Sequence, residues 1–353
     1  MGLSFIAEKD SEAVAVFDVV HADVLRFFPE LVAQLGGDPK TLLQHVGIDP
    51  SSNLFGMESS IGYRQIVNLL EHAATELRCP DFGMRLATLQ GGGRVFGAIG
   101  VVMKNSKTLG DALDYVTRHS YAHSLAARIR LERRHASHNG FVGHDILLDR
   151  LPNRCQSIEQ FLVLGNLNAI EITGGRARVR KVHFRHQPLS SLSTYRRYFG
   201  CDVLFDQQED GVVFFEQDLL CPIVNPDVQV YESVTSFINT KFTHVSPPMH
   251  AQVRGVILRF IGTEFCSNEQ VAAELHLHPR TMHRRLKAEG KSFQEIKDGV
   301  RRDLALYYLP QTDLNLTHIA GKLGYAEHSV LTRNCIRWFS APPSRLRSQM
   351  RRI

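Results

Sequence analysis

The chain has 353 residues, of which 43% are hydrophobic and 22% charged, values typical of folded globular proteins. This length and composition exclude a disordered or fibrous chain and leave room for two or three domains. No apolar run approaches the roughly 20 residues of a membrane helix, and the N-terminus is acidic where a signal peptide is basic, so we expect a cytoplasmic protein.

The formal net charge of +5 is unevenly distributed along the chain. Residues 250–353 carry 17 Lys and Arg against 9 Asp and Glu, whereas the first 249 residues carry 24 against 27. A basic C-terminal part behind a larger near-neutral part favours a polyanion-binding module joined to a different domain. The six cysteines lie far apart without a Cys-x-x-Cys pair, which is typical of reduced thiols rather than disulfides or zinc ligands.

The N-terminal part begins with residues 1–20, which lack a start signal for a helix or strand and are expected to form an arm. Helices are predicted over residues 22–90. Apolar residues recur at three- and four-residue steps from Val24 to Leu35, where Gly36-Gly37 ends the pattern. A short helix is predicted to start at Asp38-Pro39, and further helices of this region are predicted at 63–70 and 81–89.

After the glycines at 91–93 the pattern becomes mixed. Thr108 is the expected N-cap of a helix that reaches His119. Arginines alternate with apolar residues near 128–131, and Asn139-Gly140 marks a turn, so a β-hairpin is predicted here. We also expect a helix at 157–172 and strands at 179–185, 203–205 and 212–215, the last two joined through Asp210-Gly211. This mixture predicts an α+β sensor domain over residues 21–242.

The helix predicted at 225–242 carries an apolar stripe formed by Val230, Tyr231, Val234 and Phe237. This stripe is either a homodimer contact or packed inside its own domain. Residues 243–248 (THVSPP) are the expected linker, because proline stops helix and sheet alike.

From residue 249 to 353 the strand signal disappears and an all-α domain is predicted. Ser267 is the expected N-cap of a short helix, and Pro279 is the first residue of the next one. Ser292 and Glu295 form a capping box for a long helix. The Ile319-Ala320 pair repeats the earlier Val271-Ala272 pair and lies in the first of a further two predicted helices. The sequence therefore predicts two helix-turn-helix units joined by a long helix.

Three segments of this region are distinctive: HPRTMHRRLKAEGKSFQEI, RRDLALYYL and IAGKLGYAEHSVLTRNCIRWFSAPPSRLR. Through them, residues 267–347 resemble the DNA-binding domain of AraC-type (AraC/XylS) transcription regulators. The earlier segments FFPELVAQLGGDPKTLLQHVGID and FGAIGVVMKNSKTLGDALDYV resemble the effector-type, "arabinose-binding"-like N-terminal domain of one branch of that family. Two positions depart from the family pattern, since Cys335 stands where Phe is usual and Ser340 where Gly is frequent.

The resemblance implies a transcription regulator, in particular an activator, that binds double-stranded promoter DNA and works with RNA polymerase. It also implies a small-molecule effector bound by the N-terminal domain, and it implies no cofactor. The sequence does not identify the effector or the residues that bind it.

A helix fits the major groove of B-DNA, and residues in its N-terminal half reach the base edges. Phosphate contacts position such a helix without reading sequence. Six residues are expected to read bases: Arg280, His283 and Arg284 in the first unit, and His328, Ser329 and Arg333 in the second. Four residues are expected to bind phosphates: Arg285, Lys287, Thr332 and Arg337.

Two alternative functions remain open. One is an architectural or constitutive DNA-binding protein without an effector. The other is a DNA-repair enzyme that accepts an alkyl group on a cysteine, which requires an activated thiolate. No Pro-Cys-His, GxSxG, Walker or HExxH motif is present, so we expect no enzymatic activity.

We expect the other noteworthy residues of the N-terminal domain to have structural roles rather than roles in ligand or metal binding. Arg128, Arg130, Arg133 and Arg134 have the alternation of a solvated strand face, although they could meet an anionic effector. His119 and His123 have the spacing of a metal pair on a helix, but no third ligand follows, so no metal is expected. Residues 95–103 are expected to be core rather than pocket lining.

Overall fold

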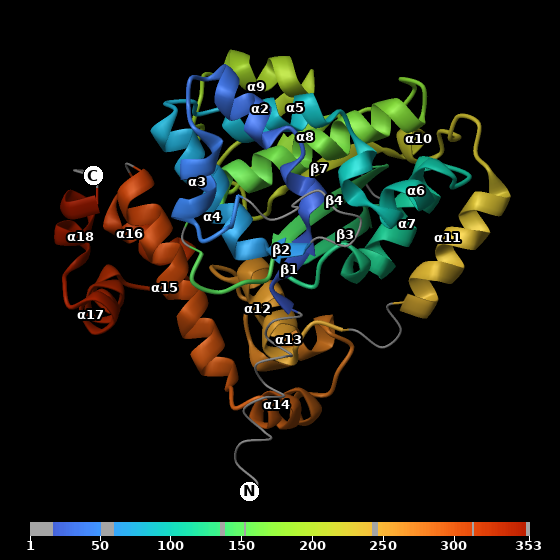
Figure 1. Ribbon diagram of the computed structural model, residues 1–353. Helices are drawn as coiled ribbons and strands as arrows, with labels where there is room; N and C mark the ends of the chain where they lie inside the picture. The colour runs from blue at the N-terminus through green and yellow to red at the C-terminus, as the bar shows by residue number, and fades with distance from the viewer. Residues whose placement is uncertain are drawn as a thin grey trace, which may run out of the picture. The chain divides into compact units, whose positions relative to one another are not determined.

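The computed structural model describes residues 17–50, 60–134, 138–151, 153–241, 246–312 and 314–350 (Figure 1). The chain divides into two compact units. The first comprises residues up to Ile146 together with Arg154–Ser246, and the second comprises Leu147–Asn153 together with the residues from Pro247 onward. The domain boundaries at residues 20, 242 and 248 stay predictions. Within the described ranges, no helix has the length and apolar character needed to cross a bilayer.

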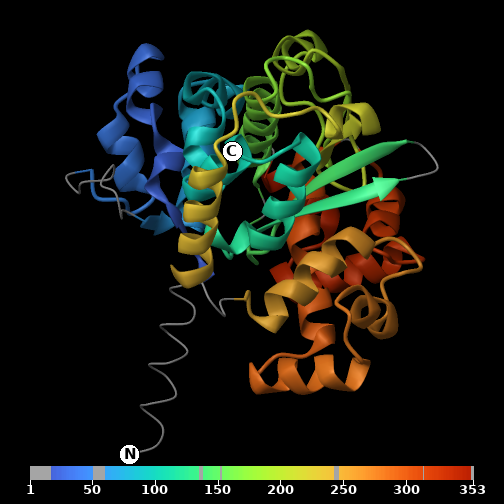
Figure 2. The ribbon, with the colours of Figure 1, turned by 90° about the vertical axis from the view of Figure 1, so that its right-hand side faces the viewer.

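The first unit is built on a five-stranded sheet with the strand order β3-β4-β7-β5-β6. Strands β3 (Ala127–Arg134) and β4 (Asn139–Ile146) form an antiparallel hairpin, visible as the two long arrows of Figure 2. Strand β7 (Gly211–Phe215) is antiparallel to both β4 and β5 (Lys181–His183), while β5 and β6 (Asp202–Leu204) are parallel. A second, antiparallel sheet joins β1 (Val19–His21) to β2 (Ser60–Gly62).

Several strand predictions are wrong in detail. Asn139 and Gly140 are not a turn but lie inside β4, opposite Arg134 and Arg133. Strands β6 and β7 are not neighbours, because β5 lies between them. The β1–β2 pair was not predicted, because β1 precedes the region predicted to be helical and β2 lies inside it. For β6 and for the β1–β2 pair the pairing partner is distant in sequence, so local pattern does not determine it.

Helices surround the two sheets. The helix predicted from Val24 to Leu35 begins only at Phe28, because Phe27 has a left-handed φ of 64°. Thr108 caps its helix as predicted, since its hydroxyl accepts the Asp111 N–H at 3.1 Å. The helices are η1 (Ala22–Leu25), α2 (Phe28–Gln34), α3 (Pro39–His45), α4 (Tyr63–Glu76), α5 (Phe82–Gln90), η2 (Gly93–Phe96), α6 (Ala98–Lys104), α7 (Leu109–His119), η3 (Ser120–Ala122), α8 (Cys155–Ile172), α9 (Leu192–Phe199), α10 (Glu216–Leu219) and α11 (Val228–Lys241).

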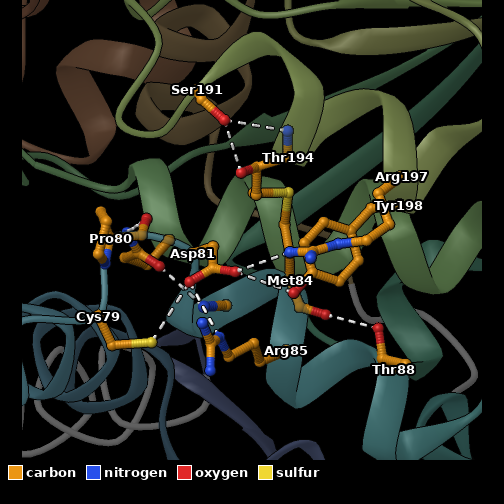
Figure 3. A network of polar contacts seen from close by, with 12 residues as sticks. Cys79, Pro80, Asp81, Met84, Arg85, Thr88, Ser191, Thr194, Arg197 and Tyr198 are labelled. Carbon is orange, nitrogen blue, oxygen red and sulfur yellow. Dashed lines mark hydrogen bonds and ion pairs between the residues drawn. The ribbon is translucent and has the colours of Figure 1, made fainter.

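A polar network connects α5 to α9 (Figure 3). The Asp81 carboxylate, only 4% exposed, accepts hydrogen bonds from Arg85 Nε at 2.9 Å and from the Tyr198 hydroxyl at 3.0 Å. Arg197 Nη2 lies 3.8 Å from the same carboxylate. A buried carboxylate requires such partners, because it has lost its hydration. The network therefore fixes α9, which leads into β6, against the N-terminal end of α5.

Arg130 contradicts the expectation that the arginines of β3 form a solvated face. It is 5% exposed, and its guanidinium is bonded to Asp145 at 2.8 Å, to Glu209 at 3.0 Å and to Glu132. Gly143 lies opposite on β4, where a Cβ would collide with the guanidinium. The absence of a side chain there lets the arginine lie flat on the sheet among three carboxylates.

The second unit is helical throughout its described residues from Pro248 onward, apart from short connections. The capping box predicted for its long helix is confirmed, because the Ser292 hydroxyl accepts the Glu295 N–H and the Glu295 carboxylate accepts the Ser292 N–H. Pro310 lies in the last turn of that helix rather than beyond its end. The helices are α12 (Met249–Phe260), α13 (Asn268–Glu274), α14 (Pro279–Ala288), α15 (Phe293–Gln311), α16 (Leu316–Lys322), α17 (His328–Phe339) and α18 (Pro343–Met350), the last not predicted.

A buried ion pair holds α12 to α15 inside this unit. Arg254 is 4% exposed, and its Nη2 donates to the Asp303 carboxylate at 2.7 Å. Its Nε donates to the Leu148 carbonyl at 3.0 Å, and the Arg150 N–H donates to Asp303 at 2.8 Å. The segment Leu147–Asn153 thus supplies two of the backbone groups that satisfy this pair, although it is about 100 residues away in sequence from α12.

We expect Asp303→Asn to destabilise the second unit by about 3–5 kcal/mol, because the substitution leaves the Arg254 charge buried without a counter-ion. Chemical denaturation of the full chain measures this loss. Asp298→Asn is the matched control on the same helix, where the partner Arg337 is well exposed, and we expect it to cost about 1 kcal/mol or less. Equal losses from the two variants would contradict the role given to the buried pair.

Candidate nucleic-acid interface

The first helix pair of the interface is α13 and α14. The Ser267 hydroxyl accepts the Gln270 N–H at 3.2 Å and starts α13 as predicted. After a short turn, in which His276 has a φ of 53°, the His278 imidazole accepts the Arg280 N–H at 3.2 Å and caps α14. Pro279 occupies the first turn of α14, where its missing N–H costs nothing.

The second pair is α16 and α17, on the opposite end of α15 from the first (Figure 1). The Asn315 side chain accepts the His318 N–H at 2.8 Å and caps α16. Gly324 follows α16 with a φ of 70°, and a Cβ there would lie 3.1 Å from the backbone nitrogen of Gly262. Glycine is therefore needed at this turn for both its conformation and its closeness to the neighbouring backbone.

Both second helices bury the same two positions. Met282 and Leu286 are at most 1% exposed in α14, and Leu331 and Cys335 are fully buried in α17. Met282 lies 49 positions before Leu331, and Leu286 lies 49 positions before Cys335. The same offset relates Arg284 to Arg333, which places the two arginines at the same position relative to the buried face of their helices.

The residues predicted to contact DNA lie on the outer faces of these helices. Nine of the ten are exposed, and Thr332 is half-buried. Within the described residues, six have no hydrogen bond or ion pair through their side chains, namely His328 and the basic residues Arg280, Arg284, Arg285, Lys287 and Arg333. Their charges are therefore not neutralised by the protein itself.

The remaining predicted residues have partners within the unit. His283 Nε2 lies 3.1 Å from the Asn268 side-chain oxygen, and Ser329 donates to Glu327 at 2.9 Å. Thr332 donates to the backbone carbonyl of His328 at 3.1 Å. The Arg337 guanidinium is bonded to both carboxylate oxygens of Asp298, at 2.6 and 2.7 Å, so a DNA phosphate would compete with Asp298 for it.

Several basic residues of the second unit serve its own structure, which the sequence analysis did not anticipate. Arg301 donates to the carbonyls of Leu323 and Gly324 and stacks on Tyr325 at 4.3 Å. Arg347 donates to two further carbonyls, and Arg259 to the Glu274 carboxylate. The excess positive charge therefore overstates the charge available to a partner. Of the unpaired basic side chains named above, four lie on α14 and one, Arg333, lies on α17.

The two departures from the family pattern occupy structural positions. Cys335 is fully buried on the inner face of α17, and burial raises the pKa of its thiol to about 12. Ser340 is the C-cap of α17 and adopts a left-handed φ of 56°, with its N–H bonded to the Ile336 carbonyl. That conformation favours glycine, because a Cβ is strained there.

We expect Ser340→Gly to raise the stability of the second unit by about 1 kcal/mol, because it removes this backbone strain. Ser348→Gly is the control, placed in the exposed interior of α18, where glycine is unfavourable and the same change should lower stability. Thermal unfolding of both variants gives the comparison. A loss of stability in Ser340→Gly would contradict the strain inferred at the cap.

Neither metal nor thiol chemistry finds support in the arrangement of the side chains. His119 Nδ1 lies 2.9 Å from the Tyr115 carbonyl, and the described residues contain no group of three or more His, Cys, Asp or Glu placed to hold a metal. Burial raises the pKa of Cys79 and of Cys201 to about 11. These cysteines are thiols at neutral pH, whereas alkyl transfer requires a thiolate.

Two family models match the chain. The arabinose-binding domain of AraC transcription regulators (N-terminal) matches residues 36–223, and a helix-turn-helix domain matches residues 271–349. The chain is 33% identical over 332 residues to the HTH-type transcriptional regulator VirS of Mycobacterium tuberculosis. This alignment covers 94% of this chain and 96% of VirS.

A partial match links the chain to the ornithine utilization regulator of Pseudomonas aeruginosa, with 31% identity over 46% of this chain and 49% of that protein. Among solved structures, the transcriptional regulator CdpR of the same organism aligns with 92% of this chain and 97% of its own, with a TM-score of 0.45 and 21% identity.

The chain belongs to the AraC family of helix-turn-helix transcription regulators. Its N-terminal unit contains the arabinose-binding-like domain of that family, and its C-terminal unit contains the DNA-binding domain. The prediction of the family and of the fold class is confirmed. The relatives named here are transcription regulators.

Proposed function

We propose that this regulator is an effector-dependent activator that reads promoter DNA with α14 and α17 and works with RNA polymerase in the cytoplasm. The observation that carries the proposal is the equivalence of Arg284 and Arg333, which are both exposed and occupy the same position on their helices. Arginine can bond O6 and N7 of guanine together, a contact that discriminates between bases.

The remaining residues of the two helices complete this interface. Arg280 and His283 in α14, and His328 and Ser329 in α17, are the further base-reading residues of the proposal. Arg285, Lys287, Thr332 and Arg337 are the phosphate-binding residues, with Arg337 released from Asp298 when it binds. Two recognition helices on one rigid connector fit successive major grooves on one face of the DNA, about 10 base pairs apart.

We expect Arg284→Ala and Arg333→Ala each to weaken binding to the cognate promoter site by about 1–3 kcal/mol while changing binding to random DNA much less. Fluorescence titration of the full chain on both DNAs measures the difference. Arg285→Ala is the control in α14, since loss of a phosphate contact should weaken both complexes alike. Equal losses on both DNAs for the Arg284 and Arg333 variants would refute base reading.

Regulation by a small molecule is the second part of the proposal. The match of residues 36–223 to an arabinose-binding-like domain supports a sensor role. A ligand changes DNA binding only if it binds the active and inactive states with different affinity. A constitutive architectural protein is the competing hypothesis, and DNA affinity that no cell metabolite alters would favour it.

The third part of the proposal is a homodimer formed through α11. The predicted stripe divides between two faces of this helix. Tyr231 packs on Tyr115 of α7 with ring centroids 6.2 Å apart, so it faces its own unit. Val230 and Phe237 are 37% and 50% exposed, and with the half-buried Val234 between them they form the face available to a second copy.

We expect Phe237→Ser to convert the dimer to a monomer, because it removes the largest apolar side chain of the exposed face. Light scattering of the full chain gives the mass. Phe265→Ser is the control, since Phe265 is 49% exposed in the second unit and should leave the mass unchanged. A wild-type protein that is monomeric with and without promoter DNA would rule out the dimer.

A further inference from the structure

A cavity of about 60 Å³ lies inside the first unit, between one face of the five-stranded sheet and helices α6, α7 and α8. The strands contribute alternate residues to it, as a sheet face requires. Most of its wall is aliphatic or aromatic, and the polar side chains that line it are Ser120, His123 and His144. No lysine, arginine, aspartate or glutamate is among its lining residues.

His144 lines this cavity and has a side-chain nitrogen that the described residues do not satisfy. The residue is 2% exposed, and its ring stacks on Phe161 of α8 with centroids 3.8 Å apart. Its Nε2 lies 3.5 Å from the Tyr63 hydroxyl, whereas its Nδ1 has no hydrogen-bond partner among the described residues. Buried polar atoms are rarely left unpaired, so we expect a ligand atom to form a hydrogen bond with this nitrogen.

The two imidazoles that line the cavity are neutral at physiological pH. Burial lowers the pKa of His144 to about 3 and that of His123 to about 4. A charged ligand would lose its hydration here without gaining a counter-ion, which is strongly unfavourable. We assign the Tyr63 hydroxyl, 3.5 Å away, as the donor to Nε2 of His144. This assignment puts the ring proton on Nδ1, so the ligand must supply a hydrogen-bond acceptor.

Gly165 of α8 is the second feature that points to a ligand. It lines the cavity, and a Cβ added to it would meet no atom within 4 Å. By contrast, a Cβ on Gly83 of α5 would overlap the backbone carbonyl of Gln156, so close packing requires that glycine. Glycine in a helix interior is unfavourable relative to alanine, and packing gives no reason for it at position 165.

The size of the cavity indicates how binding and regulation are linked. A protein cavity of about 150 Å³ is known to hold benzene, so we expect a ligand with an aromatic ring to displace part of the wall of this smaller cavity. Met103, which lines the cavity, has a flexible side chain suited to such a change. The bound state therefore differs in structure from the free one, which gives the ligand the differential affinity that regulation requires.

We propose that this cavity is the effector site, and that the effector is an uncharged, mainly apolar molecule whose single acceptor, such as a carbonyl oxygen, accepts a hydrogen bond from His144 Nδ1. The inference rests on the proposed function, because it assigns a site and a ligand class to the sensor. Sugars and organic acids fit this wall poorly, since its three polar side chains are too few for the hydroxyl groups of a sugar and it offers no cation to a carboxylate.

The test uses three probes of similar shape on the full chain, with binding measured by ligand-detected NMR and thermal shift. Acetophenone is neutral with a carbonyl, ethylbenzene lacks the acceptor, and benzoate is charged. We expect acetophenone to bind about tenfold more tightly than ethylbenzene, the effect of one hydrogen bond, and benzoate not to bind. Equal affinity for the three probes, or no binding of acetophenone at millimolar concentration, would overturn the proposal.

Two variants locate the site. Gly165→Leu should fill the cavity and abolish binding of acetophenone, whereas Gly299→Leu, at a helical glycine of α15 with equally open surroundings, should leave it unchanged. His144→Phe keeps the ring stacking on Phe161 and should lower acetophenone affinity to that of ethylbenzene. If Gly165→Leu does not fold, His144→Phe alone tests whether acetophenone binds in this cavity. Binding of acetophenone at full affinity to folded Gly165→Leu or to His144→Phe would place the site elsewhere.

Failure of the proposed function is detected separately. A titration without any probe compares the affinity for promoter DNA with that for random DNA. Equal affinity for the two DNAs would refute the proposed regulator function without bearing on the cavity. Conversely, a chain that selects its promoter but shows none of the probe discrimination would refute only the site and ligand class.

Discussion

Helix α15 is the constraint on which the DNA-binding unit depends. Its 19 residues span about 28 Å, close to the roughly 34 Å that separates successive major grooves on one face of DNA. The helix is buried through Val300, Leu304, Ala305 and Leu309, so neighbouring helices hold it along much of its length. The capping box at Ser292 fixes its beginning. The two helix pairs at its ends therefore keep a fixed separation, which independent domains on a flexible linker would not.

Positive charge in this unit is divided between holding the scaffold and facing outward. Arg254 lies in the core, where Asp303 and backbone carbonyl groups compensate its charge. Arg301 and Arg347 satisfy carbonyls at the ends of helices and in turns. The arginines at 284 and 333 have no such partners within the described residues. A phosphate or a guanine edge can bind these two without breaking an existing interaction, whereas for Arg337 it must displace Asp298.

The first unit uses its sheet in two different ways. One face carries Arg130 in a cage of carboxylates, and the other faces the apolar cavity lined by His144. The two residues come from neighbouring strands, which shows how period-two alternation separates a charged side from an apolar one. The chain leaves this unit at Ile146, two residues after His144, and Leu147–Asn153 then supplies the carbonyl and the N–H that satisfy Arg254 and Asp303.

Much of the DNA-binding unit was determined by the sequence alone. Its caps at Ser267 and Ser292 act over three residues, and the buried faces of α14 and α17 follow from a four-residue step. The same locality explains why α7 began where Thr108 predicted it. The exposed arginines of α14 and α17 were predictable too, because burial on a helix follows its period.

Tertiary structure decided what depends on distant residues. The order β3-β4-β7-β5-β6 and the β1–β2 pair join strands that no local pattern links. Arg130 is buried only because Asp145, Glu209 and a glycine meet it from other strands and loops, and the alternating pattern of β3 gave no sign of this. In the stretch 95–103, predicted to be core rather than pocket lining, Phe96, Ile99 and Met103 are buried and also line the cavity, whereas Val101 is exposed. A sequence records which side chains are apolar, but whether they close completely or leave a space at Gly165 depends on how three helices and a sheet fit together.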